Sequence, residues 1–223
     1  MKLQRVVQTL CVLLAVVVVA CALKQLDAFK QKESAHDYAW IVEQTVSCAE
    51  VDDVCGQLHL IKGNACYQQA KQNINAANNY SCAVTELEQG IRLTKTWQQG
   101  EANLNRPQTY ANLCESLRAW QDMERGDAAT QLTQRLFETS QHFLAAEPAH
   151  PAAVYYNASA RYTLLRPALL QTNDPQGLCR HLREMLSDLD TAMAQARGTA
   201  YQTSLTRLRA DVDGARGTVA GCH

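Results

Sequence analysis

Cysteine is the residue type in this chain that offers the most chemistry. Nine cysteines occur in 223 residues, and two of them, Cys11 and Cys21, belong to an N-terminal targeting segment. The other seven are Cys48, Cys55, Cys66, Cys82, Cys114, Cys179 and Cys222. Seven thiols in a small exported helical domain indicate disulfide bonds, because export places them in an oxidising compartment.

Connectivity cannot be deduced from sequence, but the helices expected below offer three pairs. These are Cys48–Cys55 flanking a turn between two helices, Cys66–Cys82 on the arms of a helical hairpin, and Cys179–Cys222 between the last hairpin and the tail. Each bond would contribute ~2–4 kcal/mol, mostly by restricting the unfolded chain. Cys114 is then left over and is expected to be buried on an apolar helix face.

Two other interpretations of the cysteines stay open. All seven would be reduced, buried small residues if the domain faced the cytosol. A metal site is the third option, because Cys179-x-His181 and Cys222-His223 offer four soft ligands. The chain has no CxxC and no established ligand spacing, so the sequence predicts no resident metal.

No recognisable catalytic motif occurs: there is no GxSxG, HExxH, glycine-rich phosphate loop or EF-hand loop. The six histidines are scattered, and an acid/base role needs partners that the sequence does not place. The pairs Glu86/Glu88 and Asp188/Asp190 are two apart, which points their members away from each other on a helix. We therefore expect a non-catalytic protein without a cofactor.

The bulk composition is that of a globular protein. The chain is 47% hydrophobic and 19% charged, with a formal net charge of -1, and it shows no Lys/Arg run. Nucleic acid is not an expected partner, since such binding requires a basic surface. Five prolines, ten glycines and no low-complexity tract leave little room for a flexible linker. We expect a single domain over residues 24–223.

Residues 1–23 have the pattern of a targeting segment, with Lys2 and Arg5 preceding an apolar run that contains LLAVVVVA. The end of that run, Val18-Val19-Ala20-Cys21, resembles the bacterial lipobox, which implies a diacylglycerol on Cys21. Its acyl chains would hold the domain at a membrane surface.

Two rival interpretations use the same residues. Ala20-x-Ala22 fits an ordinary signal-peptidase site that would release a secreted protein. The run from Val6 to Leu23 is also just long enough to remain as an uncleaved membrane anchor.

Amphipathic helices must position these residues. From Leu58 to Leu93, apolar side chains recur every three to four residues on both sides of an Asn-rich turn at Asn73–Asn79, which predicts a helical hairpin. The spacing of Ala83, Leu87 and Gly90, with Gly63 on the first helix, resembles the close contact of tetratricopeptide hairpins. A helix over Leu26–Ala49 would precede and cap the hairpin.

Two more hairpins follow. Pro107 and Asp174-Pro175 suit helix starts, Arg166-Pro167 suits a helix end, and Thr199 suits a cap for the last helix. No mature segment alternates as a strand would. The expected fold is all-α, a right-handed array of antiparallel helical hairpins with about eight helices, as the resemblance to tetratricopeptide proteins implies.

Superposing the first and third hairpins at Gly63 and Ala158 aligns a polar and aromatic series. Its members, with Tyr155 one turn earlier, are Asn64, Tyr67 and Gln68 on one helix and Tyr155, Ser159, Tyr162 and Thr163 on the other. In tetratricopeptide arrays the inner helices line a groove, so the resemblance implies that these residues bind an extended peptide or a partner helix. The alternative is that Tyr67 and Tyr162 simply pack between hairpins.

The sequence favours a membrane-anchored, envelope-facing scaffold or adaptor, similar to tetratricopeptide lipoproteins of the periplasm, that binds a protein partner and supports assembly of a membrane-associated complex. A small-molecule binding lipoprotein associated with a transporter is the second interpretation, and would need a deep apolar pocket. A cell-wall enzyme is the third, and would need a cleft with paired carboxylates.

Overall fold

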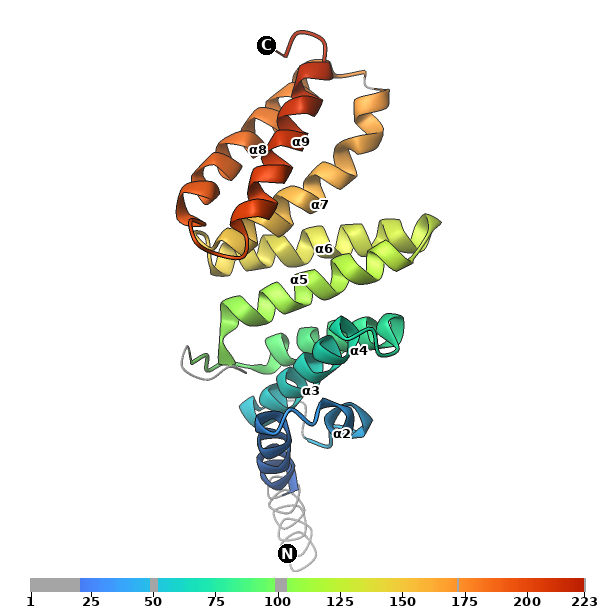
Figure 1. Cartoon of the computed structure of the whole chain (residues 1–223), viewed down its shortest axis with the longest axis vertical. Coiled ribbons are helices and arrows are strands. Elements are labelled where there is room, and N and C mark those ends of the chain that lie inside the picture. Colours follow the sequence, from blue (N-terminus) through green and yellow to red (C-terminus); the bar gives the residue numbers. More distant parts are fainter. Residues whose placement is uncertain (1–20, 49–51, 99–103, 172, 223) are drawn as a thin grey trace, which may run out of the picture. The chain divides into compact units, whose positions relative to one another are not determined.

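The computed structural model describes residues 21–48, 52–98, 104–171 and 173–222 (Figure 1). Helices joined by turns and short irregular segments make up this part of the chain, and it contains no strand. Residues 21–34 are helical. The labelled helices are α2 (Tyr38–Glu43), α3 (Asp53–Lys71), α4 (Ala76–Leu93), α5 (Arg106–Met123), α6 (Gly126–Ala146), α7 (Pro151–Leu170), α8 (Pro175–Gln195) and α9 (Gln202–Thr218). The expected all-α array, in which helices adjacent in sequence pack together, is confirmed.

The chain divides into two compact units, Met1–Ser116 and Leu117–His223. The boundary falls inside α5, so a continuous helix rather than a linker joins the two units. The expectation of one domain over 24–223 stays a prediction.

The targeting segment lies mostly outside the described residues. Residues 18–20 of the lipobox and residues 6–20 of the alternative anchor belong to that part, whereas Cys21 is described and is exposed with a free thiol. In the ranges that the structure describes, no helix combines the length and the apolar character needed to cross a bilayer.

In the first unit, the predicted single helix over Leu26–Ala49 is wrong, because the helix that contains Leu26 ends at residue 34. His36 has a positive φ of 55°, which ends the helical run, and Asp37 then caps the short helix α2 by accepting the backbone N–H of Trp40. The two pieces fold onto one core, in which Phe29 meets the edge of Trp40 at 6.0 Å between ring centroids. Ala22, Leu26, Phe29 and Ile41 pack there with Leu58, Ile61 and Ala65 of α3.

Helices α3 and α4 form the predicted hairpin (Figure 1). Asp52 caps α3 by accepting the backbone N–H of Cys55 at 2.7 Å. Two glycines allow the helices to approach closely: a Cβ on Gly63 would lie 2.7 Å from Leu87, and one on Gly90 would lie 2.5 Å from Leu60. The contacts pair Gly63 with Leu87 and Gly90 with Leu60, as antiparallel helices require, and they confirm the close contact expected from the sequence.

The predicted turn at Asn73–Asn79 is too long. Helix α4 begins at Ala76 because Asn75 adopts the left-handed conformation, with φ 43°, and turns the chain at once. Asn79 then belongs to α4, where its side-chain amide donates to the carbonyl of Ile74 at 2.7 Å.

In the second unit, α7, α8 and α9 lie side by side around an apolar core that includes Leu182, Met185 and Leu205 (Figure 1). Asp174 caps α8 as expected, accepting the backbone N–H of Gly177 at 2.8 Å. The predicted helix end at Arg166-Pro167 is wrong, since α7 continues to Leu170. Pro167 leaves the carbonyl of Thr163 without an amide donor, and Thr163 is only half-buried, so water can solvate that carbonyl.

Thr199 does not occupy the cap position of the last helix. Helix α9 begins at Gln202 with Tyr201 as its cap residue, and Thr199 instead accepts the backbone N–H of Tyr201 through its hydroxyl at 3.3 Å.

Three disulfides join the pairs expected from helix geometry. Their Cα–Cα separations are 5.4 Å for Cys48–Cys55, 5.9 Å for Cys66–Cys82 and 5.5 Å for Cys179–Cys222. Cys114 is free and buried on α5, and its burial raises the pKa of the thiol. The fully reduced alternative therefore does not describe this structure. The alternative ligand set is not formed either, because Cys179 and Cys222 are bonded to each other; His223 lies outside the described residues.

Candidate functional sites

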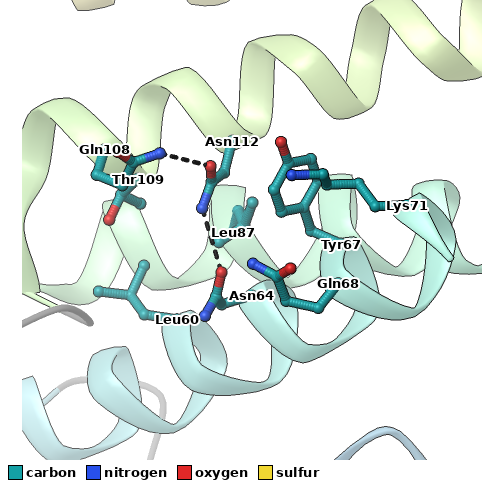
Figure 2. Close-up of a pocket in the computed structure, with 9 residues that line it drawn as sticks. All are labelled: Leu60, Asn64, Tyr67, Gln68, Lys71, Leu87, Gln108, Thr109 and Asn112. Carbon is teal, nitrogen blue, oxygen red and sulfur yellow. Dashed lines mark hydrogen bonds between the residues drawn. The ribbon is translucent and has the colours of Figure 1, made fainter. Parts of the chain in front are cut away.

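A cavity of about 250 Å³ lies beside α3 in the first unit, and we call it the α3 cavity. Figure 2 shows its lining: Leu60, Asn64, Tyr67, Gln68 and Lys71 from α3, Leu87 from α4, and Gln108, Thr109 and Asn112 from α5. Four of these nine side chains are carboxamides, and Lys71 is the single charged member of the lining. Such a surface is polar, weakly cationic and suited to hydrogen bonding.

A chain of hydrogen bonds orders the carboxamides of the α3 cavity. Gln108 donates to the Asn112 carbonyl at 2.8 Å, and Asn112 donates to the Asn64 carbonyl at 3.2 Å (Figure 2). Asn64 in turn donates to the Glu33 carboxylate at 3.2 Å. Because each carboxamide both donates and accepts, the chain holds the side chains in one orientation. The α3 cavity is therefore preorganised on this side.

Tyr67, the aromatic residue of the α3 cavity, is packed against other groups and leaves little surface for a partner to contact. Tyr67 is buried, with 8% of its surface exposed, and the ammonium of Lys71 lies 5.2 Å from the centre of its ring. Gln68 is half-buried. For Tyr67 the packing interpretation thus describes most of the side chain, whereas Asn64 and Gln68 keep accessible polar surface.

A second cavity, of about 360 Å³, lies between α7 and α9, and we call it the α7 cavity. It is lined by Tyr155, Ser159, Tyr162 and Thr163 of α7 and by Ser204, Arg207, Leu208 and Asp211 of α9. The Tyr162 hydroxyl donates to the backbone carbonyl of Asp211 at 3.3 Å, and the Thr163 hydroxyl donates to the carbonyl of Ser159 at 3.0 Å. The four α7 residues are all half-buried, so their side chains combine packing with access from solvent.

All seven residues that the sequence singled out for partner binding line one of these two cavities. The structure brings Asn64, Tyr67 and Gln68 together in the α3 cavity and the other four together in the α7 cavity. The superposed tyrosines differ in environment, because Tyr67 is buried beneath Lys71 while Tyr162 is half-buried and bonded to α9.

Sequence reasoning missed the α5 side of the α3 cavity. The signal was present as a stripe of small polar residues at helical spacing, since Thr109, Asn112 and Ser116 are all buried on α5. Buried polar side chains are hydrogen-bonded in native proteins, so such a stripe points to a polar network across a helix interface.

A larger cavity in the second unit was missed as well. It has a volume of about 730 Å³ and lies among α6, α7 and α8, where Phe137, Leu144 and Pro148 give apolar surface. Arg161 and His181 supply its polar side. Glu184 accepts from Arg161 at 2.9 Å, and this hydrogen bond, assisted by His181, lowers the pKa of the Glu184 carboxyl.

A cluster of reactive groups lies at the start of α3. Across the described ranges, the one group of three side chains with metal-ligand types is Cys48, Cys55 and His59, whose ligand atoms lie within 4.8 Å of one another. The two sulfurs are joined in a disulfide, so they offer no thiolate to a metal in this state. The expectation that no metal is resident stays a prediction.

His59 is held by charged groups across the α3–α4 hairpin. Its Nδ1 lies 2.5 Å from Glu86, and the ammonium of Lys62 lies 3.1 Å from the other carboxylate oxygen. Burial acts to raise the pKa of Glu86, but the hydrogen bond from His59 and the charge of Lys62 outweigh it and lower the pKa below its usual value. A half-buried ionic cluster therefore lies next to the Cys48–Cys55 disulfide.

Comparison with known proteins places the chain in no established family. No family model, curated protein or solved structure matches it. Over the described residues, the structure defines an all-α protein in which helices adjacent in sequence pack together and three disulfides cross-link the chain.

Proposed function

We propose that this protein is a membrane-anchored, envelope-facing helical-repeat adaptor, which binds a protein partner and supports assembly of a membrane-associated complex. The observation that carries the proposal is the gathering of all seven candidate residues in the α3 and α7 cavities. Residues that superpose between two hairpins and also line a cavity in each are better suited to binding than residues scattered over a surface.

The chemistry of the cavities favours a polypeptide as the bound group. A peptide backbone alternates N–H donors with C=O acceptors, and the carboxamides of Asn64, Gln68 and Gln108 can serve both. The exposed parts of Tyr155 and Tyr162 offer aromatic contact to side chains of the same segment. Binding of extended segments or helices in grooves of helical arrays uses these contacts.

The location is part of the same proposal. Three disulfides in the described chain favour an oxidising compartment outside the cytoplasm. A lipid on the exposed Cys21 would keep the array at the membrane surface and raise its local concentration around membrane-bound partners. An adaptor needs this effective concentration more than it needs high intrinsic affinity.

The test is a comparison of two double variants of the full-length chain. Gln68→Ala with Tyr162→Ala removes one accessible contact from each cavity, while the control, Thr85→Ala with Thr206→Ala, changes exposed positions on α4 and α9. Partners cross-linked in native membranes are identified with the wild-type chain, and each is then titrated against both variants.

The cavity variant is expected to lose at least about tenfold in affinity, a loss of roughly 1.4 kcal/mol, and the control to keep wild-type affinity. Circular dichroism checks that helicity is unchanged in both. Equal affinities for the cavity variant and the control would contradict the assignment of the two cavities as binding sites.

A second candidate function is small-molecule binding, and the cavity of about 730 Å³ among α6, α7 and α8 favours it. Its apolar side chains and the Arg161 guanidinium suit an anionic ligand with an apolar body. Native mass spectrometry of protein purified from its own membranes tests this function. A stoichiometric small molecule lost in Arg161→Gln supports it, and a ligand-free mass contradicts it.

A further inference from the structure

The Cys48–Cys55 disulfide differs from the other two in where its sulfurs lie. Cys48 is half-buried and belongs to the non-helical segment after α2, whereas Cys55 is fully buried in the first turn of α3. Cys179 and Cys222 are both buried; Cys82 is half-buried like Cys48, but Cys66 and Cys82 both lie within long packed helices. Cys48 is therefore half-buried and lies outside any helix.

This disulfide also closes the shortest loop. Its cysteines are 7 residues apart, compared with 16 for Cys66–Cys82 and 43 for Cys179–Cys222. A short loop restricts the unfolded chain least, so this bond contributes least to folding stability and its opening lowers that stability least. Opening it leaves α2 held by its packing on α3, and leaves α3 held by that packing and by the Cys66–Cys82 bond.

The third distinguishing feature is His59, which lies one helical turn after Cys55 and has a ring nitrogen within 4.8 Å of both sulfurs. Glu86 of α4 bonds this imidazole, and Lys62 of α3 pairs with the other oxygen of the same carboxylate. A nearby imidazolium and the amide end of a helix both stabilise a thiolate. Neither of the other two disulfides belongs to such a group among the described residues.

We propose that Cys48–Cys55 is a thiol–disulfide exchange site whose substrate is a dithiol, such as the reduced site of a thiol oxidoreductase. A substrate thiolate attacks the Cys48 sulfur, forming a mixed disulfide, and the S–S bond breaks with its electron pair leaving on Cys55. His59, held by its hydrogen bond to Glu86, lies within 4.8 Å of the departing Cys55 sulfur and stabilises the thiolate that forms there. The second substrate thiolate then attacks the substrate sulfur of the mixed disulfide and releases Cys48 as a thiolate. The substrate ends as a disulfide, oxidised by two electrons, and the protein as a dithiol.

The direction of attack follows from burial. Cys48 is half-buried whereas Cys55 has no exposed surface, so the incoming thiolate attacks at Cys48. Asp52 is occupied in capping α3 through the backbone N–H of Cys55, so it fixes the position of the cysteine in the helix end. This reactivity is independent of the α3 and α7 cavities and of any partner bound there.

The first experiment measures the order in which the three disulfides open in the full-length wild-type chain. The protein is exposed to limiting dithiothreitol, quenched with acid, alkylated and mapped by peptide mass. Cys48 and Cys55 are expected to be alkylated first, at least about tenfold faster than the other two pairs. Simultaneous opening, or earlier opening of either other pair, would overturn the proposal.

The second experiment tests His59 with a matched control. His59→Gln keeps a polar side chain but removes the imidazole, and His142→Gln makes the same change at an exposed position on α6. Opening of Cys48–Cys55 is expected to slow about tenfold in the first variant only, with the other two bonds unaffected. Slowing of all three bonds, or of none, would overturn the role of His59.

The third experiment tests which sulfur is attacked. In Cys55→Ser the remaining Cys48 thiol is expected to form a mixed disulfide rapidly with glutathione disulfide, whereas in Cys48→Ser the buried Cys55 thiol is expected to react slowly. The reverse order would overturn the direction of attack. If one of these variants does not fold, the opening order of the wild-type chain still supports or overturns the proposal.

Discussion

A close backbone approach in the α3–α4 hairpin, at Gly90, predicts the sign of a change in stability. In Gly90→Ala, the new Cβ would lie 2.5 Å from the Leu60 side chain and 2.9 Å from its backbone nitrogen. The side chain can rotate, but the backbone nitrogen moves only if α3 and α4 separate. Overpacking of this kind costs about 1–3 kcal/mol, and replacing a helical glycine by alanine returns about 1 kcal/mol. Since backbone is involved, we expect a net loss of about 2 kcal/mol.

Gly214→Ala is the matched control. Gly214 lies inside α9, and a Cβ there would meet no atom within 4 Å. The same substitution then shows the helix propensity alone, and we expect a gain of about 0.5–1 kcal/mol.

Urea unfolding followed by circular dichroism measures both variants. The midpoint should fall in Gly90→Ala and rise in Gly214→Ala, while the dependence of the unfolding free energy on urea stays unchanged in both. If Gly90→Ala were as stabilising as Gly214→Ala, the α3 and α4 backbones would not be in close contact at Gly90, and the reasoning would be refuted.

Three further predictions follow from buried groups. Replacing both Cys66 and Cys82 with alanine removes a disulfide that spans a sequence separation of 16 and should lower the free energy of unfolding by ~3 kcal/mol in urea titrations. Because the folded pKa of Glu86 is lowered, its contribution to stability should be present above its usual pKa of 4.5 and be lost as pH falls through the lower folded value. The stability difference between wild type and Glu86→Gln, measured from pH 7 to pH 3, should therefore shrink towards the acid end; a constant difference would contradict this. Cys114 should resist a thiol reagent until urea unfolds the chain, and rapid labelling in the native state would disprove its burial.

The sequence predicted the helices well where periodicity and capping agree. The apolar spacing in Leu58–Leu93, the cap at Asp174 and the glycines of the hairpin all act within one helix or between two consecutive helices. The three cysteine pairs that the expected helices offered each join neighbouring elements, and the structure forms these pairs, although the sequence alone left the connectivity open. The errors at Asn73–Asn79 and around His36 came from single residues with positive φ, whose conformation composition does not reveal.

The α3 and α7 cavities show most clearly how helical register and tertiary packing contribute separately to a site. The correspondence of Tyr67 with Tyr162 in two hairpins was predicted from the sequence, because it rests on helical register. That Asn112 bonds Asn64 from 48 residues away, and that His59 joins Glu86 beside a disulfide, was decided by the tertiary structure. Helical periodicity sets which face a side chain occupies, whereas the packing of separate helices sets which faces meet, and only that packing turns separate polar residues into a site.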